Sequence, residues 1–499
     1  MSDRTLMFSI ALACSIAQST RPNIVFIFSD DHARQAISAY GSKLMRTPAI
    51  DQLAREGVRF DRHYTANPLC APSRASLLTG KLSHINGHKD NESKFDGTQE
   101  TFPKLLQQAG YQTAWIGKWH LESAPTGFNY WEILPGQGNY FNPDFITASG
   151  THRETGYVTN LITDKAKSWL KETSGKPFFL MVGQKAPHRP WQPNLDKLDL
   201  FANHKFPLPP DFNRNYAELN SGAAKAHMRV NQNLKFDSDL LVDSPPARLN
   251  ESQRTTWLSK MTSQDAEFHR RLDSGESRDA VIYDRYIKEY LRCISSVDDS
   301  VRDILKSLDD LGLAKNTIVI YGSDQGFFLG EFGWFDKRWF YEPSSGTPLI
   351  VRWPGVKSGV VKTVTSNIDL APTILEAAGL TPPTTIQGES LCDLIKNKKT
   401  QSKQPFYGHF YESNDGEHKV PKCVSLIDGN YKLMFYYELN EWEMFDIGKD
   451  KGEHRNLWAD PKSADTRKRM VTKLLETQRR YSEDQDLIDR IAKAVNQGK

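Results

Sequence analysis

The sequence is poor in cysteine, and its charges are nearly balanced. Only 5 of its 499 residues are cysteine, and no two of them have the C-x-x-C spacing of a zinc site. The chain has 64 lysines and arginines against 61 aspartates and glutamates, interspersed along its length, for a formal net charge of +3. A fold built on a cystine framework is therefore excluded, and no basic stripe predicts a nucleic-acid partner.

Long apolar runs are also missing. No stretch reaches the roughly 18 residues that a membrane-spanning helix needs, so we expect no membrane span. The N-terminus has a short apolar run at residues 6–13, behind Arg4, and small residues at 15–17. We interpret residues 1–17 as a signal peptide, which predicts a periplasmic or extracellular (secreted) protein. Two alternatives stay open: a tail without a targeting role, and a lipoprotein acylated on Cys14, although the residues before Cys14 match that motif poorly.

The remaining sequence alternates between helix and strand patterns. Residues 23–28 (NIVFIF) form a continuous apolar run, typical of a strand that is buried on both faces. A helix is predicted at 48–56, with Thr47 as its cap. Three further helices are each followed by a strand: 102–109 by 113–116, 159–171 by 178–182, and 284–311 by 317–321. This alternation predicts an α/β fold in which a large mixed, mostly parallel sheet is sandwiched by helices.

Two regions depart from the alternation. Residues 201–277 are polar and contain several prolines, and we predict an insertion of substrate-side loops and short helices there. After residue 380, short strand patterns at 405–411, 422–426, 431–437 and 443–445 precede a helix pattern at 464–480. We therefore predict a main domain at residues 21–380 and a smaller C-terminal α+β subdomain with an antiparallel sheet at residues 381–499.

Four short segments carry residues suited to chemistry. Asp30 and Asp31 follow the first strand, and Asp324 and Gln325 follow the strand predicted at 317–321. The other two segments are CAPSR at 70–74 and GYQTAWIGKWH at 110–120, and Lys337 lies downstream of the Asp324 segment, at the end of GWFDK. Each segment alone has an ordinary structural explanation, such as a turn or a buried cysteine. Ligands of parallel sheets nevertheless gather beyond the carboxyl ends of the strands, where these acids fall.

Together the segments resemble the sulfatase family, within the alkaline-phosphatase-like superfamily. The C-x-P-S-R stretch and the GYQTAWIGKWH stretch match the two signatures of that family, in order. The resemblance spans roughly residues 22–379, and FDIGKDKGEHRNL near the C-terminus is similar to the family's C-terminal subdomain. It implies an alkaline-phosphatase-like fold and a sulfuric ester hydrolase that removes sulfate from carbohydrates.

The resemblance also implies a nucleophile and a metal site. Cys70 would be oxidised to formylglycine by a formylglycine-generating maturation enzyme, and a hydroxyl of the aldehyde hydrate would attack sulfur to give a sulfo-enzyme intermediate. Arg74 would hold residue 70 and the metal-side carboxylates in register. The ligands offer oxygen donors, which suit a hard cation such as Ca²⁺, with Mg²⁺ as the alternative. The predicted metal ligands are Asp30, Asp31, Cys70 as formylglycine, Asp324 and Gln325.

Four further residues take catalytic roles by the same resemblance. Lys118 and Lys337 would contact the sulfate oxygens and counter their charge in the transition state. His120 would bind the second hydroxyl of the hydrate and assist its deprotonation. His188, in the APHRP stretch after the strand predicted at 178–182, would protonate the leaving alkoxide.

Several stretches narrow the substrate class. KAPHRPWQP and SDQGFFLGE are similar to bacterial carbohydrate sulfatases, above all the N-acetylglucosamine-6-sulfatase and mucin-desulfating group. Phe332 stands where many relatives have histidine; if that histidine contacts the sugar or the sulfate, its loss predicts a different ring or sulfate position. Sulfated polysaccharide and glycan fragments both stay open. Four aromatic residues are either a stacking wall for a sugar or part of the core. They are Trp191, Trp334, Trp339 and Phe340.

Two other functions stay open. A phosphomonoesterase, phosphodiesterase or phosphonate hydrolase of the same superfamily would share the fold and some metal ligands, although plain phosphatases have Ser or Thr where this chain has Cys70. A non-catalytic protein that binds sulfated glycans is the other alternative, but every expected catalytic position of the family is filled in this chain.

Overall fold

We analysed a computed structural model of the chain, which describes residues 21–173, 175–397, 404–413 and 415–496. The predicted signal peptide at residues 1–17 and Cys14 lie outside the described residues. Within them, Cys70, Cys293, Cys392 and Cys423 are free and buried. No helix of the described part is long and apolar enough to cross a bilayer.

Ten strands of the described chain form one sheet in the order β13-β2-β12-β9-β1-β8-β4-β5-β6-β7. At its centre, β1 (Asn23–Ser29) lies parallel between β8 (Phe178–Gly183) and β9 (Thr317–Ser323). The strand β4 (Gln112–Lys118) pairs in parallel with β8 and with β5 (Tyr130–Leu134). Antiparallel pairings bring in β12 (Leu349–Arg352) on one side and β6 (Asp144–Thr147) and β7 (Gly150–Arg153) on the other. Finally, β2 (Val58–Phe60) and β13 (Gly359–Val361) complete the β12 edge.

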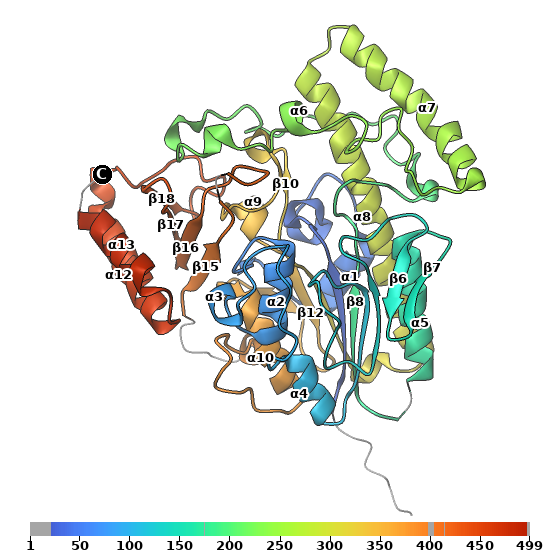
Figure 1. The fold of residues 1–499 in the computed structure, drawn as a ribbon, viewed down its shortest axis with the longest axis horizontal. Helices are drawn as coiled ribbons and strands as arrows, with labels where there is room; N and C mark the ends of the chain where they lie inside the picture. Colours follow the sequence, from blue (N-terminus) through green and yellow to red (C-terminus); the bar gives the residue numbers. More distant parts are fainter. Residues whose placement is uncertain (1–20, 174, 398–403, 414, 497–499) are drawn as a thin grey trace, which may run out of the picture.

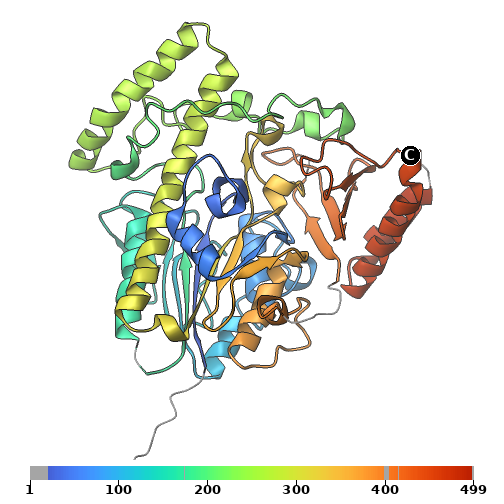
Figure 2. The ribbon, with the colours of Figure 1, turned by 180° about the vertical axis from the view of Figure 1, so that it is seen from behind.

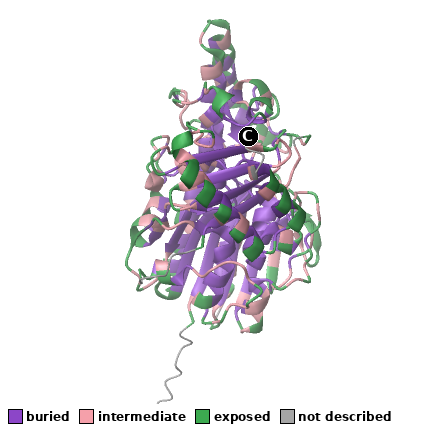
Figure 3. Ribbon diagram, turned by 90° about the vertical axis from the view of Figure 1, so that its left-hand side faces the viewer, coloured by how far each residue is buried: buried purple, intermediate pink, exposed green. Residues whose placement is uncertain are grey.

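Both faces of this sheet are covered, and β1 shows why a continuous apolar run is needed. Ile24 and Phe26 belong to one apolar cluster, whereas Val25 and Ile27 belong to another, because side chains of a strand alternate between faces. The first cluster includes α2 (Cys70–Thr79), α4 (Phe102–Gln108) and α10 (Leu370–Ala377). The second includes α1 (Pro48–Glu56), α5 (Val158–Glu172) and α8 (Arg278–Asp310). Figures 1 and 2 show these helices on the two sides of the sheet, and Figure 3 shows its buried strands, which confirms the predicted fold class.

A second, smaller sheet lies beside the first toward the C-terminus (Figure 1). It contains β15 (Phe406–Phe410), β16 (Cys423–Asp428), β17 (Tyr431–Tyr436) and β18 (Glu441–Asp446), all antiparallel. One face packs against α12 (Ala464–Arg480) and α13 (Gln485–Asn496). This sheet and α12 were expected from the sequence, whereas α13 was not.

The insertion at 201–277 differs from its prediction. The short elements expected there occur up to α6 (Val230–Asn233), but α7 (Glu251–Asp273) is a helix of 23 residues at the edge of the molecule (Figure 1). A capping box between Asn250 and Gln253 starts it. The expectation of short helices is therefore wrong here, because α7 buries so few residues that its apolar pattern is weak. The buried residues of α7 are Trp257, Met261, Asp265, Phe268 and Arg271.

Several short elements complete the description. They are α3 (Ser83–Asn86), α9 (Glu342–Ser345), α11 (Cys392–Ile395), β3 (His63–Tyr64), β10 (Phe328–Leu329), β11 (Phe335–Asp336) and β14 (Thr365–Ser366).

Candidate active site

The acidic residues predicted as metal ligands meet at the carboxyl ends of two neighbouring strands. Ser29 of β1 and Ser323 of β9 are register partners, so the residues that follow each strand lie side by side. The backbone N–H of Asp31 donates to Asp324 Oδ1 at 3.1 Å. Oxygen atoms of Asp30, Asp31 and Asp324 all lie within 4.8 Å of one another, and all three residues are buried.

Cys70 is the first residue of α2 and is fully buried beside these acids. Its Sγ lies 3.5 Å from Asp30 Oδ1 and 3.3 Å from Gln325 Nε2. Burial raises the pKa of the Cys70 thiol to about 12, so an unmodified cysteine stays a thiol at neutral pH. Because the thiolate is the nucleophilic form of cysteine, this environment does not suit thiol catalysis.

Arg74 lies one turn further along α2 and binds three groups of the site. Its Nε and one terminal nitrogen donate to Asp324 Oδ2 at 3.1 and 2.9 Å, and that terminal nitrogen lies 3.8 Å from Asp30 Oδ1. The other terminal nitrogen donates to the backbone carbonyl of Lys118 at 2.9 Å. The fully buried guanidinium therefore ties α2 to the ends of β1, β4 and β9.

Two buried lysines form ion pairs with two of the acids. Lys118 ends β4 and forms an ion pair with Asp30. Lys337 Nζ lies 2.7 Å from Asp31 Oδ2. The residues on either side of Lys337 have left-handed backbones, with φ of 76° at Asp336 and 89° at Arg338, so the local chain is bent to present this lysine.

The two histidines predicted from the sequence also reach the site. His188 follows β8, and its Nε2 lies 3.8 Å from Asp31 Oδ2, while its Nδ1 lies 2.5 Å from the carbonyl of Arg189. A carbonyl only accepts, so Nδ1 of His188 carries a proton. Burial, reinforced by Lys118, lowers the pKa of His188 well below 6.5 and that of His120 to about 2. Both imidazoles are therefore neutral in this state.

Three cations, Arg74, Lys118 and Lys337, face the three aspartates of the described site, so the charges would balance only if all three carboxylates were ionised. Although burial works against it, the nearby cations, Lys118 foremost, hold the pKa of Asp30 well below 3.8. Burial raises the pKa of Asp31, and burial with the charge of Asp30 raises the pKa of Asp324 to about 8. The site thus holds more acidic groups than its own cations keep ionised.

This excess, together with the donor set, fits a hard divalent cation. Oxygen donors from three carboxylates converge, and they are the ligands that Ca²⁺ and Mg²⁺ prefer. Gln325 donates from Nε2 to Asp31 Oδ1 at 2.5 Å, which leaves its buried Oε1 without a hydrogen-bond partner among the described residues. An orphaned buried carbonyl beside such acids fits a fourth oxygen ligand.

Sequence reasoning missed a polar group around Lys337. Asp336 lies 2.6 Å from Arg338, 3.7 Å from Arg189 and 3.4 Å from His418. The position of Asp336 and Arg338 beside Lys337 is a signal that could have pointed to them. His418 comes from the C-terminal part of the chain, and no local pattern marks it.

The hypothesis of an aromatic stacking wall is wrong. Trp191, Trp334, Trp339 and Phe340 are each at most 1% exposed and belong to the core. Trp334 stacks on Trp339 with ring centroids 5.1 Å apart, and Phe332 stacks on Trp334 at 5.2 Å. Aromatic side chains of this size gain more from burial in the core than from exposure at the mouth of a site.

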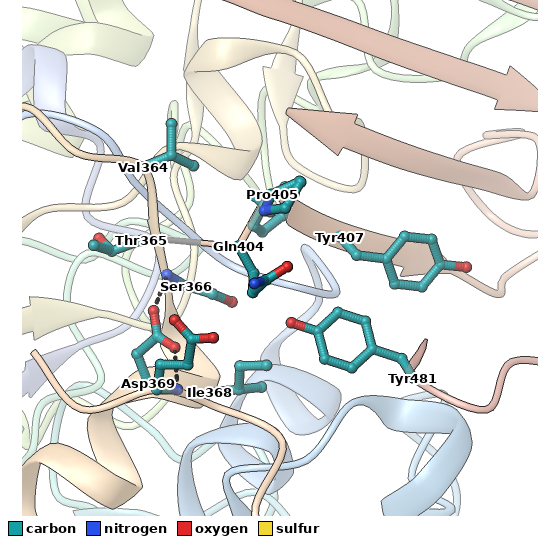
Figure 4. A pocket seen from close by; sticks show the side chains of 11 residues that line it. Val364, Thr365, Ser366, Ile368, Asp369, Gln404, Pro405, Tyr407 and Tyr481 are labelled. Atoms are coloured by element: carbon teal, nitrogen blue, oxygen red, sulfur yellow. Dashed lines mark hydrogen bonds between the residues drawn. The ribbon is translucent and has the colours of Figure 1, made fainter. Parts of the chain in front are cut away.

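A separate cavity lies between residues 364–369, the start of β15 and Tyr481 (Figure 4). Asp369 accepts hydrogen bonds there from the backbone N–H groups of Ser366 and Glu389, each at 2.8 Å. None of the described residues that line this cavity is among the predicted site residues. The predicted chemistry therefore gathers at one place, around Cys70.

Comparison with known proteins agrees with this arrangement. A model of the sulfatase family matches residues 22–380, and a model of the C-terminal region of N-sulphoglucosamine sulphohydrolase matches residues 330–480. The chain is 41% identical over 491 residues to the N-acetylglucosamine-6-O-sulfatase of Bacteroides thetaiotaomicron, covering 94% of this chain and 88% of that protein.

Two solved structures are also similar. One is in complex with its substrate D-glucosamine-2-N,6-O-disulfate; it has a TM-score of 0.90, 40% identity, and coverage of 93% of this chain and 99% of that chain. The other, the phosphonate monoester hydrolase of Agrobacterium radiobacter, has a TM-score of 0.70 and covers 92% of this chain and 96% of that chain, but at 20% identity it shows the fold alone. From the family match over residues 22–380 and the 41% identity, the chain belongs to the sulfatase family.

Proposed function

We propose that this sulfatase removes the 6-O-sulfate group from sulfated glucosamine residues of carbohydrates. The observation that carries the proposal is the 41% identity, over nearly the whole chain, to an N-acetylglucosamine-6-O-sulfatase. The similar structure that holds a glucosamine disulfate supports the same substrate class. Three buried cations around Cys70 supply the charge that a sulfate ester requires.

The nucleophile of the proposal is a formylglycine made from Cys70. The hydrated aldehyde would supply a geminal diol as the nucleophile in place of a thiol that burial keeps protonated. Arg74 fixes the first turn of α2 against Asp324, so the side chain at residue 70 is held beside the carboxylates. This conversion requires a formylglycine-generating enzyme as a maturation partner.

The metal of the proposal is Ca²⁺, with Mg²⁺ as the alternative. Asp30, Asp31, Asp324, Gln325 and the modified residue 70 would hold it. Bound there, the cation would polarise a sulfate oxygen and lower the pKa of a hydroxyl at residue 70.

The remaining residues divide the proton and charge chemistry. Lys118 and Lys337 lie where they can bind sulfate oxygens once their carboxylate partners hold a metal. His188 is the candidate general acid. It would have to donate a proton from Nε2 to the oxygen of the leaving sugar. His188 is neutral without substrate, so we infer that the negative sulfate ester favours its protonation.

The assay is release of free sulfate from a panel of desalted sugars by the matured, calcium-loaded enzyme. We expect turnover of glucosamine 6-sulfates and little turnover of glucosamine 3-sulfate or galactose 6-sulfate. Preference for another sulfate position would overturn the substrate assignment. The corresponding phosphate ester separates a phosphatase or phosphonate hydrolase from a sulfatase, and binding without turnover would indicate a glycan-binding protein.

We also propose export from the cytoplasm, because residues 1–17 have the pattern of a signal peptide. N-terminal sequencing of the protein from a cell fraction tests this. A mature N-terminus after Ala17 in the periplasm or medium is the expected result, and an intact N-terminus in the cytoplasm would contradict it.

A further inference from the structure

Gln137, which no sequence pattern singles out, lies between two of the catalytic candidates, Lys118 and His120. Leu134, the last residue of β5, is the register partner of Lys118 at the end of β4. The chain that leaves β5 therefore starts beside the lysine. Gln137 follows three residues later, in the loop between β5 and β6.

Two glycines give this loop its shape. Gly136 has a φ of 51° and Gly138 a φ of 69°, both in the left-handed region. A Cβ on Gly138 would also lie 2.7 Å from Leu134 Cδ1. The loop is thus bent on both sides of Gln137 in a way that few other residues allow, and Gln137 is half-buried at its tip.

The carboxamide of Gln137 bridges Lys118 and His120. Lys118 Nζ donates to Gln137 Oε1 at 2.6 Å, and Gln137 Nε2 lies 3.1 Å from His120 Nε2. An ammonium group has hydrogens only to donate, so the oxygen of the amide must face Lys118. The NH₂ group must then face His120, and since it donates, the Nε2 of His120 must be the acceptor.

This chain of donors determines the tautomer of a catalytic candidate. A neutral imidazole carries one proton, so if Nε2 accepts, the proton is on Nδ1. The imidazole is neutral here because burial, aided by Lys118, lowers the pKa of His120 to about 2. The lone pair of His120 Nε2 is then held by the Gln137 amide. The protonated Nδ1 is buried and has no hydrogen-bond partner among the described residues, so Nδ1–H is the group of His120 that can donate to a ligand in the site.

We propose that Gln137 is a positioning residue of the sulfatase reaction, which holds the Lys118 ammonium in place and fixes His120 as the Nδ1–H tautomer. The inference rests on the proposed function and deepens it, because it assigns the residue that orients Lys118 and His120. It predicts that the identity of the amide matters and not only its volume.

The first test measures the tautomer and needs no turnover. The enzyme is labelled with ¹⁵N-histidine, and among its 13 histidines the ring signals of His120 are identified by their loss in His120→Asn. We expect a protonated Nδ1 and an unprotonated Nε2 in the wild type. The Gln137→Glu variant cannot donate, so its His120 should carry the proton on Nε2 or on both nitrogens. A wild-type His120 protonated at Nε2 would overturn the inference.

The second test is kinetic and uses whichever sulfate ester the wild type hydrolyses. Gln137→Glu and the uncharged, similarly sized Gln137→Met should both lower kcat by about 10- to 100-fold, the loss typical of an outer partner of a catalytic group, with little change in KM. Only Gln137→Glu should move the acidic limb of the pH–rate profile upward, because a carboxylate raises the pKa of His120. Asn139→Asp, an exposed residue of the same loop, is the matched control and should change neither.

The outcomes separate the two proposals. Wild-type enzyme that releases no sulfate from glucosamine 6-sulfate but hydrolyses another ester contradicts the proposed substrate and leaves the Gln137 comparison intact. A Gln137→Met variant with unchanged kcat, or one that changes KM alone, contradicts the positioning role. Thermal melting of each variant within a few degrees of the wild type shows that it is folded.

Discussion

Replacing Asp324 by asparagine should make the metal-free protein more stable and abolish its response to metal. Without a cation, burial and the charge of Asp30 raise the pKa of Asp324 from 3.8 to about 8. Below pH 3.8 the group is protonated in both the folded and the unfolded chain, and stability is unaffected. As the pH rises toward 8, the unfolded chain loses this proton and the folded chain keeps it, so stability falls.

The magnitude follows from the pKa difference. At pH 7 the folded protein still holds the Asp324 proton, whereas the unfolded chain, whose pKa lies about three units below this pH, has lost it. At roughly 1.36 kcal/mol per unit, this difference lowers the free energy of unfolding by about 4 kcal/mol. Asparagine has the same shape and no such cost. Arg74 already faces a neutral Asp324 in the metal-free state and keeps Asp30 at 3.8 Å.

Thermal melting in EDTA and in excess Ca²⁺, from pH 5 to pH 8.5, measures both effects. In EDTA the Asp324→Asn variant should melt several degrees above the wild type at pH 7 to 8, with the difference shrinking toward pH 5. Calcium at a thousandfold excess over Kd should stabilise the wild type by about 4 kcal/mol, which raises its melting temperature, and it should leave the melting temperature of the variant unchanged. Asp309→Asn, an exposed carboxylate on α8, is the control. A variant that melts below the wild type in EDTA, or that still responds to calcium, would refute this reasoning.

Three further predictions concern side chains of the site and the core. Lys337→Met should lower kcat/KM by about 10²- to 10³-fold, because it removes the buried cation that we propose binds the sulfate. The exposed Lys306→Met should have no effect, and an equal loss in both variants would contradict the role. His188→Gln should slow hydrolysis of sugar sulfates far more than that of 4-nitrophenyl sulfate, whose leaving group needs no acid, and equal losses on both esters would exclude general-acid catalysis. Trp334→Ala should destabilise the fold by about 3 to 5 kcal/mol, seen as a lower melting temperature, because it empties a core position; a stable variant with a raised KM would restore the sugar-contact hypothesis.

Much of the central architecture could be predicted from local patterns. The run at residues 23–28 is apolar on both faces because β1 lies in the middle of a covered sheet. Asp30 and Asp324 could be placed together because parallel strands end at the same edge, and the register of β1 with β9 brings them side by side. The motif that begins at Cys70 joins these acids because it starts the helix α2 beside that edge.

What could not be predicted depends on contacts between distant segments or on weak patterns. The helix α7 has a mostly exposed surface, so its sequence resembles that of a polar loop. Aromatic residues near the motifs suggested a sugar platform, yet Trp334 and Trp339 stack on each other inside the core. Gln137 lies outside both signatures, and its place between Lys118 and His120 follows only from the register of β5 with β4. The roles of the individual site residues stay predictions until the variants are measured.

The most direct test of the account is peptide mass spectrometry of residue 70 in enzyme purified with its activity intact. The account predicts that the peptide containing residues 70–74 carries an aldehyde in place of the thiol, in a fraction that rises in step with specific activity across preparations. Fully active enzyme in which this peptide carries only unmodified cysteine would contradict it.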